Sequence, residues 1–122
     1  MKARTKAITI TALLIPFASF AGEADVVNVK INKTGIQTYS FDVTVLHADS
    51  GWEHYANKWD IIDNNGNILG TRVLYHPHEN EQPFTRSLAG VHIPQEVRSV
   101  TVRAHDLVHQ YGGKTFEVRV PE

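Results

Sequence analysis

The amino-acid sequence predicts an all-β fold, an antiparallel β-sandwich of about seven strands of the immunoglobulin and fibronectin type III kind. Hydrophobic residues alternate with polar ones over most of the chain after residue 21, which is the period of half-buried strands. Turn-forming residues separate these segments, and no segment shows the period of an amphipathic helix. Hydrophobic residues make up 42% of the 122 residues and charged residues 20%, as in a globular protein.

Residues 1–21 are predicted to be a cleaved secretory signal peptide. Three basic residues precede a short hydrophobic run, and small residues occupy the positions three and one before the expected cleavage after Ala21. The run is too short to span a bilayer. The expected mature chain, 22–122, is a single domain with nine basic and thirteen acidic residues and without a membrane span. We therefore expect a periplasmic or secreted protein.

The mature chain divides into seven alternating segments. The predicted strands cover residues 26–32, 39–45, 58–62, 68–76, 84–89, 99–104 and 115–120. In the first strand, the alternation places Val27, Val29 and Ile31 on one face. Asn64-Asn65-Gly66-Asn67 predicts a hairpin turn between the third and fourth strands, because Asn and Gly accept the positive φ of tight turns. Trp59 occupies the strand on which immunoglobulin-like domains often carry a core tryptophan.

The strand order gathers most of the seven histidines at one end of the sandwich. With antiparallel strands, the connections 47–57, 76–82 and 105–113 all lie at that end, whereas His92 lies at the other. Loops at one end of a sandwich often carry binding sites. The candidate metal ligands are the histidines in or beside these three connections: His47, His54, His76, His78, His105 and His109.

Zinc, copper(II), nickel and non-haem iron all accept imidazole and carboxylate ligands, and among them we favour copper(II) or zinc. The chain has no cysteine, and its one methionine is residue 1, so thiolate and thioether ligands are absent from the predicted domain. Imidazole and carboxylate suit copper(II) and zinc. In the same connections, Asp49, Glu79 and Asp106 are expected to act as ligands or as acceptors that orient an imidazole. An extended His76-Pro77-His78 segment would present both imidazoles on one face, about 7 Å apart.

An interaction module is the alternative function. Trp52, Tyr55, Tyr111 and Arg86 lie in or near the histidine-rich connections and would line a groove for a protein, peptide or glycan. Arg86 is alternatively a structural partner of a nearby carboxylate. Neighbouring imidazoles also depress one another's pKa, so that such an interface would respond to pH.

Enzymatic and nucleic-acid-binding functions are less favoured. The sequence contains neither a G-x-S-x-G motif nor an H-E-x-x-H motif, although an open metal site with Asp106 or Glu79 as a base is a third alternative. The formal net charge of −1 gives no basic surface excess for binding nucleic acid. No organic cofactor is expected.

Three segments carry a resemblance to known proteins. GWEHYANKWD (51–60), HPHENEQPFTRSL (76–88) and VRAHDLVHQYGGK (102–114) resemble segments of small exported bacterial sandwich proteins of unassigned function, which implies export and fold but no activity. The chain is more distantly similar to periplasmic copper-resistance sandwich proteins, which bind copper through histidine and aspartate. Those proteins have a histidine at the mature N-terminus, where this chain has Gly22. Superoxide reductases place iron on a similar sandwich through a cysteine that this chain lacks.

Overall fold

A computed structural model describes residues 22–122 of the chain, and the predicted signal peptide lies outside the described residues. All regular structure in 22–122 is β, which confirms the predicted fold class. The strands are β1 (Asp25–Gly35), β2 (Thr38–Leu46), β3 (Ala56–Ile62), β4 (Ile68–Val73), β5 (Phe84–His92), β6 (Ser99–Asp106) and β7 (Phe116–Arg119).

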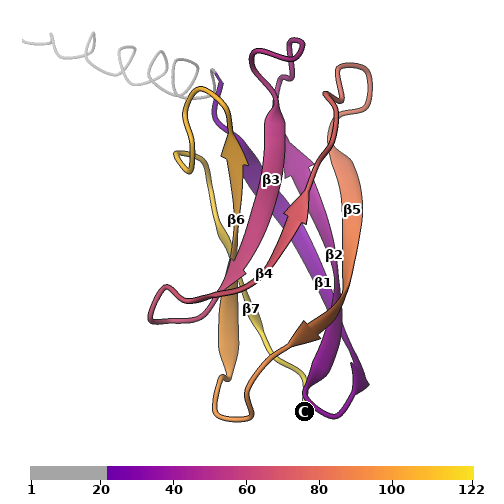
Figure 1. Cartoon of the computed structure of the whole chain (residues 1–122), viewed down its shortest axis with the longest axis vertical. Coiled ribbons are helices and arrows are strands. Elements are labelled where there is room, and N and C mark those ends of the chain that lie inside the picture. Colours follow the sequence, from indigo (N-terminus) through magenta and orange to yellow (C-terminus); the bar gives the residue numbers. More distant parts are fainter. Residues whose placement is uncertain (1–21) are drawn as a thin grey trace, which may run out of the picture.

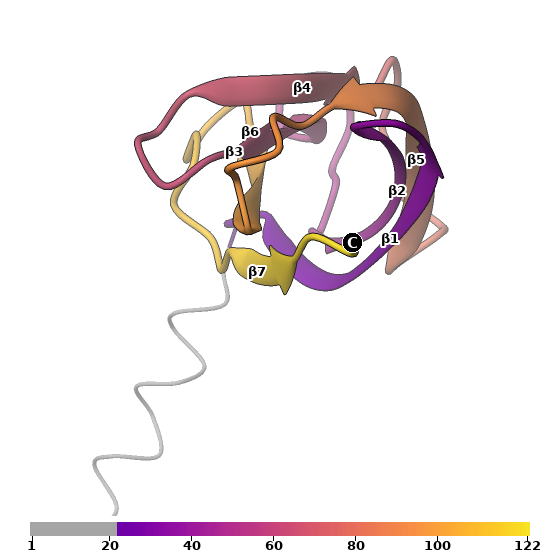
Figure 2. The same ribbon diagram turned by 90° about the horizontal axis from the view of Figure 1, so that it is seen from below.

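The seven strands form two antiparallel sheets that face one another. One sheet has the order β1-β2-β5 and the other β4-β3-β6-β7. Figure 1 shows the strands running along the long axis of the molecule, and Figure 2 shows the two sheets facing one another. The arrangement is that of a fibronectin-like sandwich, in which the strand directions fix which connections share an end.

The core fills the space between the two inner faces. Trp59 on β3, Phe41 on β2 and Phe84 on β5 are its largest fully buried hydrophobic side chains. Along β2, the buried positions alternate with partly exposed ones, as expected for one face against the core and one against water. The tryptophan expected at the centre of the fold is therefore present, with an exposed fraction of 0%.

Three details of the strands differ from the simple alternation. An irregularity between Val26 and Asn28 shifts the phase of β1, so Val26 is buried and Val27 is 42% exposed. Strand β4 ends at Val73 rather than at residue 76, because its pairing with β3 stops at Lys58 and Val73. Strand β5 continues to His92 because its pairing with β2 extends that far.

The connections 47–55, 74–83 and 107–115 lie together at the upper end of Figure 1, beside the start of the described chain. The opposite end carries the β1–β2 turn and the 93–98 connection. The predicted hairpin turn is confirmed, and Asp63 accepts backbone hydrogen bonds within it. Among residues 22–122 there is no helix with the length and hydrophobicity that a bilayer crossing requires.

Candidate metal centre

Two polar side chains continue the inner faces of the sheets into the upper end of the core. Asp106 follows Val102 and Ala104 on the inner face of β6, and its exposed fraction is 0%. His47 stands one residue beyond β2, in phase with the buried Val43 and Val45, and is 2% exposed. Strand periodicity therefore directs an imidazole and a carboxylate into the same buried space.

A second imidazole joins them from the β2–β3 loop. The Nε2 atom of His54 lies 3.2 Å from Nε2 of His47 and 3.0 Å from Oδ2 of Asp106. The third separation, between His47 Nε2 and Asp106 Oδ2, is 3.9 Å. One ligand atom from each of these three residues lies within 4.8 Å of the others. We call His47, His54 and Asp106 the upper triad.

The spacing of the upper triad matches the coordination shell of a small metal ion. A tetrahedral zinc ion holds its nitrogen and oxygen ligands at about 2.0–2.2 Å, which sets those ligands roughly 3.3 Å apart. Within 22–122, the other carboxylate oxygen of Asp106, Oδ1, is buried without a hydrogen-bond partner. A buried carboxylate oxygen without a donor is uncommon, and a cation at this point would satisfy it.

Asp49 orients His47. The Nδ1 atom of His47 donates a hydrogen bond to Oδ1 of Asp49, which also accepts the N–H of Ala56 at 3.1 Å. The other oxygen of Asp49 accepts the N–H of His78 at 2.7 Å. With Nδ1 engaged, the Nε2 atom of His47 faces His54 and Asp106. This carboxylate–histidine pairing fixes the tautomer that a metal ligand needs.

The surroundings of the site favour the charged forms of His47, Asp49 and Asp106. Burial lowers the pKa of His47, but hydrogen bonds to Asp49 and the Gly22 carbonyl and the carboxylate charges raise it overall above its ordinary value. Burial raises the pKa of Asp49 and Asp106, but donated hydrogen bonds and the nearby imidazoles lower both overall. The site therefore keeps two carboxylates ionised and attracts a proton, or another cation, between its nitrogens.

His109 stands beside the upper triad. After β6 the chain turns tightly, with Asp106 paired to Gln110, and Oδ2 of Asp106 accepts the N–H of His109 at 2.8 Å. Nδ1 of His109 lies 3.3 Å from the same oxygen and 2.7 Å from the carbonyl oxygen of Gly22. Its side chain is partly exposed, so His109 closes the solvent side of the cluster.

His76 and His78 lie outside the upper triad. Their ring centroids are 4.6 Å apart, but His76 is exposed whereas His78 is buried against Phe84, with ring planes 9° apart. The expectation of two imidazoles on one extended face is wrong, because β4 ends at Val73 and the 76–78 segment is not a strand. The His78 ring reaches the site at Asp49, with 4.0 Å between Nδ1 and Oδ2.

His105 and Glu79 are also separate from the triad. His105 points away from the core because it is out of phase with Asp106, and its Nδ1 atom lies 2.6 Å from Oδ1 of Asn57. Burial and the charge of Lys58 lower the pKa of His105. Glu79 is exposed in the β4–β5 connection. Six histidines share one end of the fold, and ring nitrogens of three of them, His47, His54 and His109, lie 3.9, 3.0 and 3.3 Å from Oδ2 of Asp106.

The expected groove residues make separate contacts. Tyr111 donates a hydrogen bond of 2.6 Å to the buried Asp60, and so holds the β6–β7 loop against the outer face of β3. Arg86 pairs with Glu81 at 3.2 Å, which is the structural role considered for it. Trp52, 63% exposed, packs edge-on against Tyr55.

Two residues of the site are absent from the sequence-based set. Oε1 of Gln82 accepts the N–H of His47 at 2.9 Å, and its Nε2 donates to the carbonyl of His78 at 2.9 Å. The carbonyl oxygen of Gly22 lies between the imidazoles. Gln82 has no sequence signal, whereas the predicted cleavage after Ala21 singles out Gly22 as the first mature residue.

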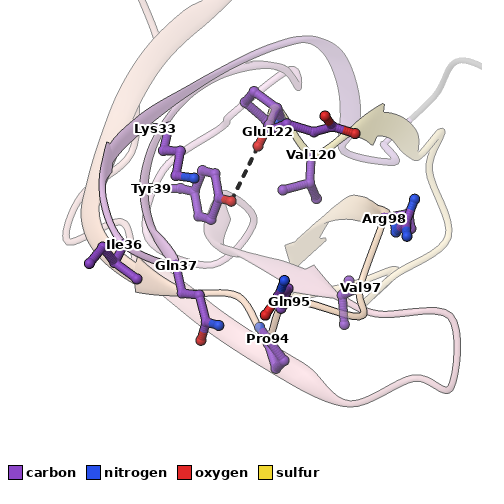
Figure 3. Close-up of a pocket in the computed structure, with 11 residues that line it drawn as sticks. Lys33, Ile36, Gln37, Tyr39, Pro94, Gln95, Val97, Arg98, Val120 and Glu122 are labelled. Carbon is purple, nitrogen blue, oxygen red and sulfur yellow. Dashed lines mark hydrogen bonds between the residues drawn. The ribbon is translucent and has the colours of Figure 1, made fainter.

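The opposite end of the sandwich has a different character. A pocket of about 390 Å³ opens there, lined by Lys33, Tyr39, Arg98 and residues of the C-terminus. Figure 3 shows the hydrogen bond from the Tyr39 hydroxyl to the carbonyl of Pro121 across this pocket. His92, at the end of β5, is exposed at this end, and within residues 22–122 it is not part of the His47–His54–Asp106 group.

The chain is similar to a known protein over most of its length. A Halomicrobium mukohataei protein named "Putative lipoprotein" is 40% identical over 96 residues, which cover 79% of this chain and 47% of that protein. The chain thus spans about half the length of the curated relative it matches. No family model and no solved structure matches the chain. The comparison supplies a relative for most of the sandwich without a ligand or activity.

Proposed function

We propose that this protein is an exported metal-binding protein, a carrier or sensor that holds copper(II) or zinc at the upper triad. The convergence of His47 Nε2, His54 Nε2 and Asp106 Oδ2 carries this proposal, with pairs of these atoms 3.0, 3.2 and 3.9 Å apart. Two imidazoles and a carboxylate suit either metal, and an N/O ligand set favours copper(II) by the usual affinity order.

The burial of the site supports metal binding over a purely structural role. With Nδ1 of His47 donating to Asp49, a neutral His47 leaves Nε2 as an acceptor, and this nitrogen faces a second acceptor, the Gly22 carbonyl oxygen, at 2.9 Å. A metal ion bound to Nε2 of His47 removes this conflict, while Asp49 continues to hold the far side of the ring. The ligand atoms are already close together, so little order is lost on binding.

Export is the second part of the proposal. The predicted signal peptide supports it, and the name of the Halomicrobium relative is in keeping with an exported protein. Because cleavage is predicted after Ala21, we propose that the processed chain is released into the periplasm or the medium. The metal would then be bound outside the cytoplasm.

The test is a metal titration of the processed protein, produced from the full chain in an exporting host and stripped with a chelator. We expect one site with a dissociation constant below micromolar for copper(II) or zinc. The affinity should weaken as the pH falls through about 6, because protons compete for the imidazoles. Failure of copper(II), zinc and nickel to bind below micromolar concentration would overturn the proposal.

Exposed aromatic side chains favour a second candidate, an interaction module for a protein, peptide or glycan. Trp52 is 63% exposed and Tyr75 is 76% exposed, and both belong to the connections at the upper end. Aromatic residues of this kind are enriched in binding surfaces. Quenching of Trp52 fluorescence by candidate glycans or peptides in chelated protein would support this function, and unchanged fluorescence with metal-dependent binding elsewhere would oppose it.

A further inference from the structure

The backbone of Gly22 lies at the centre of the histidine cluster. Its carbonyl oxygen is 2.9 Å from Nε2 of His47, 3.1 Å from Nε2 of His54 and 2.7 Å from Nδ1 of His109. We propose that Gly22 completes the metal site through its carbonyl oxygen and, after cleavage behind Ala21, through its free α-amino group. This inference rests on the proposed metal-binding function.

The surroundings of the Gly22 carbonyl are those of a ligand atom. A carbonyl oxygen has two lone pairs, so it cannot accept a normal hydrogen bond from three imidazoles at once. Its separations from His47 and His54 also match the spacing of about 3.3 Å expected between ligands of one ion. The oxygen therefore fits as a further ligand beside the upper triad.

The local backbone allows only glycine at this position. Gly22 has a φ of +95°, which side chains disfavour, and an added Cβ would overlap the ring of His109. A side chain here would either displace the carbonyl or push His109 away. The absence of a side chain thus permits the chain to enter the cluster.

The following residues hold Gly22 in place. Ala24 is fully buried, the N–H of Val26 donates to the carbonyl of Lys114 at 2.9 Å, and the N–H of Lys114 donates to Asp25 at 2.7 Å. Gly113 lies so close to the carbonyl of Ala24 that a Cβ there would overlap it. The start of the chain is therefore clamped to the β6–β7 loop, which carries His109.

Cleavage would add a stronger ligand at the same point. A free α-amino group has a pKa of about 8, so a metal ion that binds its nitrogen readily displaces the proton to water near neutral pH. Together, the amine nitrogen and carbonyl oxygen of one residue close a five-membered ring with a metal. Such a chelate adds a nitrogen to the imidazole set, which favours copper(II). The consequence is that the precursor binds metal weakly and the site matures only after export.

The test inserts one serine between Ala21 and Gly22 in the full chain. Processing after Ala21 then moves the amino group one residue away from the cluster while leaving His47, His54 and Asp106 intact. Mass spectrometry identifies each N-terminus, and thermal unfolding in chelator verifies that the variant folds. We expect copper(II) affinity about 10²-fold weaker than in the processed wild type, because the second arm of a chelate is lost.

A second variant and a spectroscopic readout complete the experiment. Gly22→Ala should weaken binding, whereas Gly66→Ala, with a similar φ of +85° but open space at the hairpin turn, should not. Copper(II) electron paramagnetic resonance on protein labelled with ¹⁵N-glycine should show an amine nitrogen in the wild type and lose it on insertion. A wild type that binds copper as tightly as the insertion variant would overturn this inference and leave the proposed function standing. An N-terminus other than Gly22, or no metal binding at all, would also overturn it.

Discussion

The six histidines at the upper end form two groups, those beside Asp106 and those apart from it, and strand phase separates His47 from His105. His47 continues the buried positions of β2, and Asp106 continues those of β6, so these side chains meet at the end of the core. His105, one residue before Asp106, faces outward and contacts Asn57 instead. Residues close in sequence thus have unrelated surroundings. Proximity to a loop is a weaker indicator of a shared site than the face of the strand that carries the residue.

The largest expected difference between the two groups is in metal affinity. His54→Ala removes a ligand whose side chain is already partly exposed, so the fold should tolerate it. We expect binding at least about 10²-fold weaker, because losing even an outer partner of a ligand costs 10–100-fold. His105→Ala is the matched control, and we expect its affinity within about threefold of the wild type. Calorimetric titration measures both, and equal losses in the two variants would contradict the division.

Asp49 and Glu79 provide the corresponding comparison between carboxylates. Asp49→Asn removes the charge that orients His47, and we expect copper(II) or zinc affinity to fall about 10–100-fold. Glu79→Gln changes an exposed carboxylate of a neighbouring loop and should leave affinity unchanged. The same titration checks both variants. A larger loss of affinity in Glu79→Gln than in Asp49→Asn would contradict the assignment, because it would place the metal at the β4–β5 connection.

Tyr111 tests whether the loop after β6 is held independently of metal. Tyr111→Phe removes the hydroxyl that donates to the buried Asp60, which keeps Thr71 as a donor at 2.6 Å. We expect the free energy of unfolding to fall by about 1–3 kcal/mol, as for the loss of a donor to a buried polar group. Urea unfolding in chelator measures this change. If the free energy of metal binding fell by more than the free energy of unfolding, Tyr111 would belong to the binding site instead.

The smallest expected effect is on the pH dependence of the free energy of unfolding, which should differ between His78 and His47. Burial, with the charges of Arg86 and His76, lowers the pKa of His78 below its ordinary value of 6.5. As the pH falls below 6.5 the unfolded chain therefore takes up a proton that the folded protein resists, and stability decreases. His78→Phe, which can keep the stacking on Phe84, removes this loss. The free energy of unfolding of His78→Phe, relative to that of the wild type, should therefore be higher at pH 5.5 than at pH 8. The difference should develop as the pH falls below the unfolded pKa of about 6.5.

His47 should behave in the opposite way. Its pKa is raised overall, so its stabilising contribution is complete below 6.5 and disappears as the pH rises through its folded value. The destabilisation caused by His47→Gln in chelated protein should accordingly be greater at pH 5.5 than at pH 8. Urea unfolding curves at the two pH values test both histidines, and parallel pH dependence of the two variants would contradict the contrast.

Much of the fold follows from the sequence, because a period of two and strong turn residues define the strands. The alternation in β2 and β6 places their buried residues correctly, and Asn65-Gly66 marks a turn that the structure contains. Val26 could not be placed in this way, because a local irregularity in β1 changes the phase without a marker in the sequence. The early end of β4 depends on pairing with β3, which is a tertiary effect.

The site was only partly predictable. Strand order places the three connections at one end, and strand phase distinguishes Asp106 from His105. The position of His54 depends on the path of an irregular loop, and its contact with Asp106 joins residues 52 positions apart. Gly22 contributes only backbone atoms, so no side-chain pattern identifies it as part of the site. Its position follows from the clamp between the start of the chain and the β6–β7 loop, which no local pattern encodes.

The most direct test of the upper triad is the position of a bound metal. Crystals of the processed protein grown with zinc would show it by anomalous scattering at the zinc edge. We expect one peak within about 2.0–2.2 Å of Nε2 of His47, Nε2 of His54 and an oxygen of Asp106. A peak at His76, His78 or His105 instead, or no peak between the triad residues in excess zinc, would contradict it.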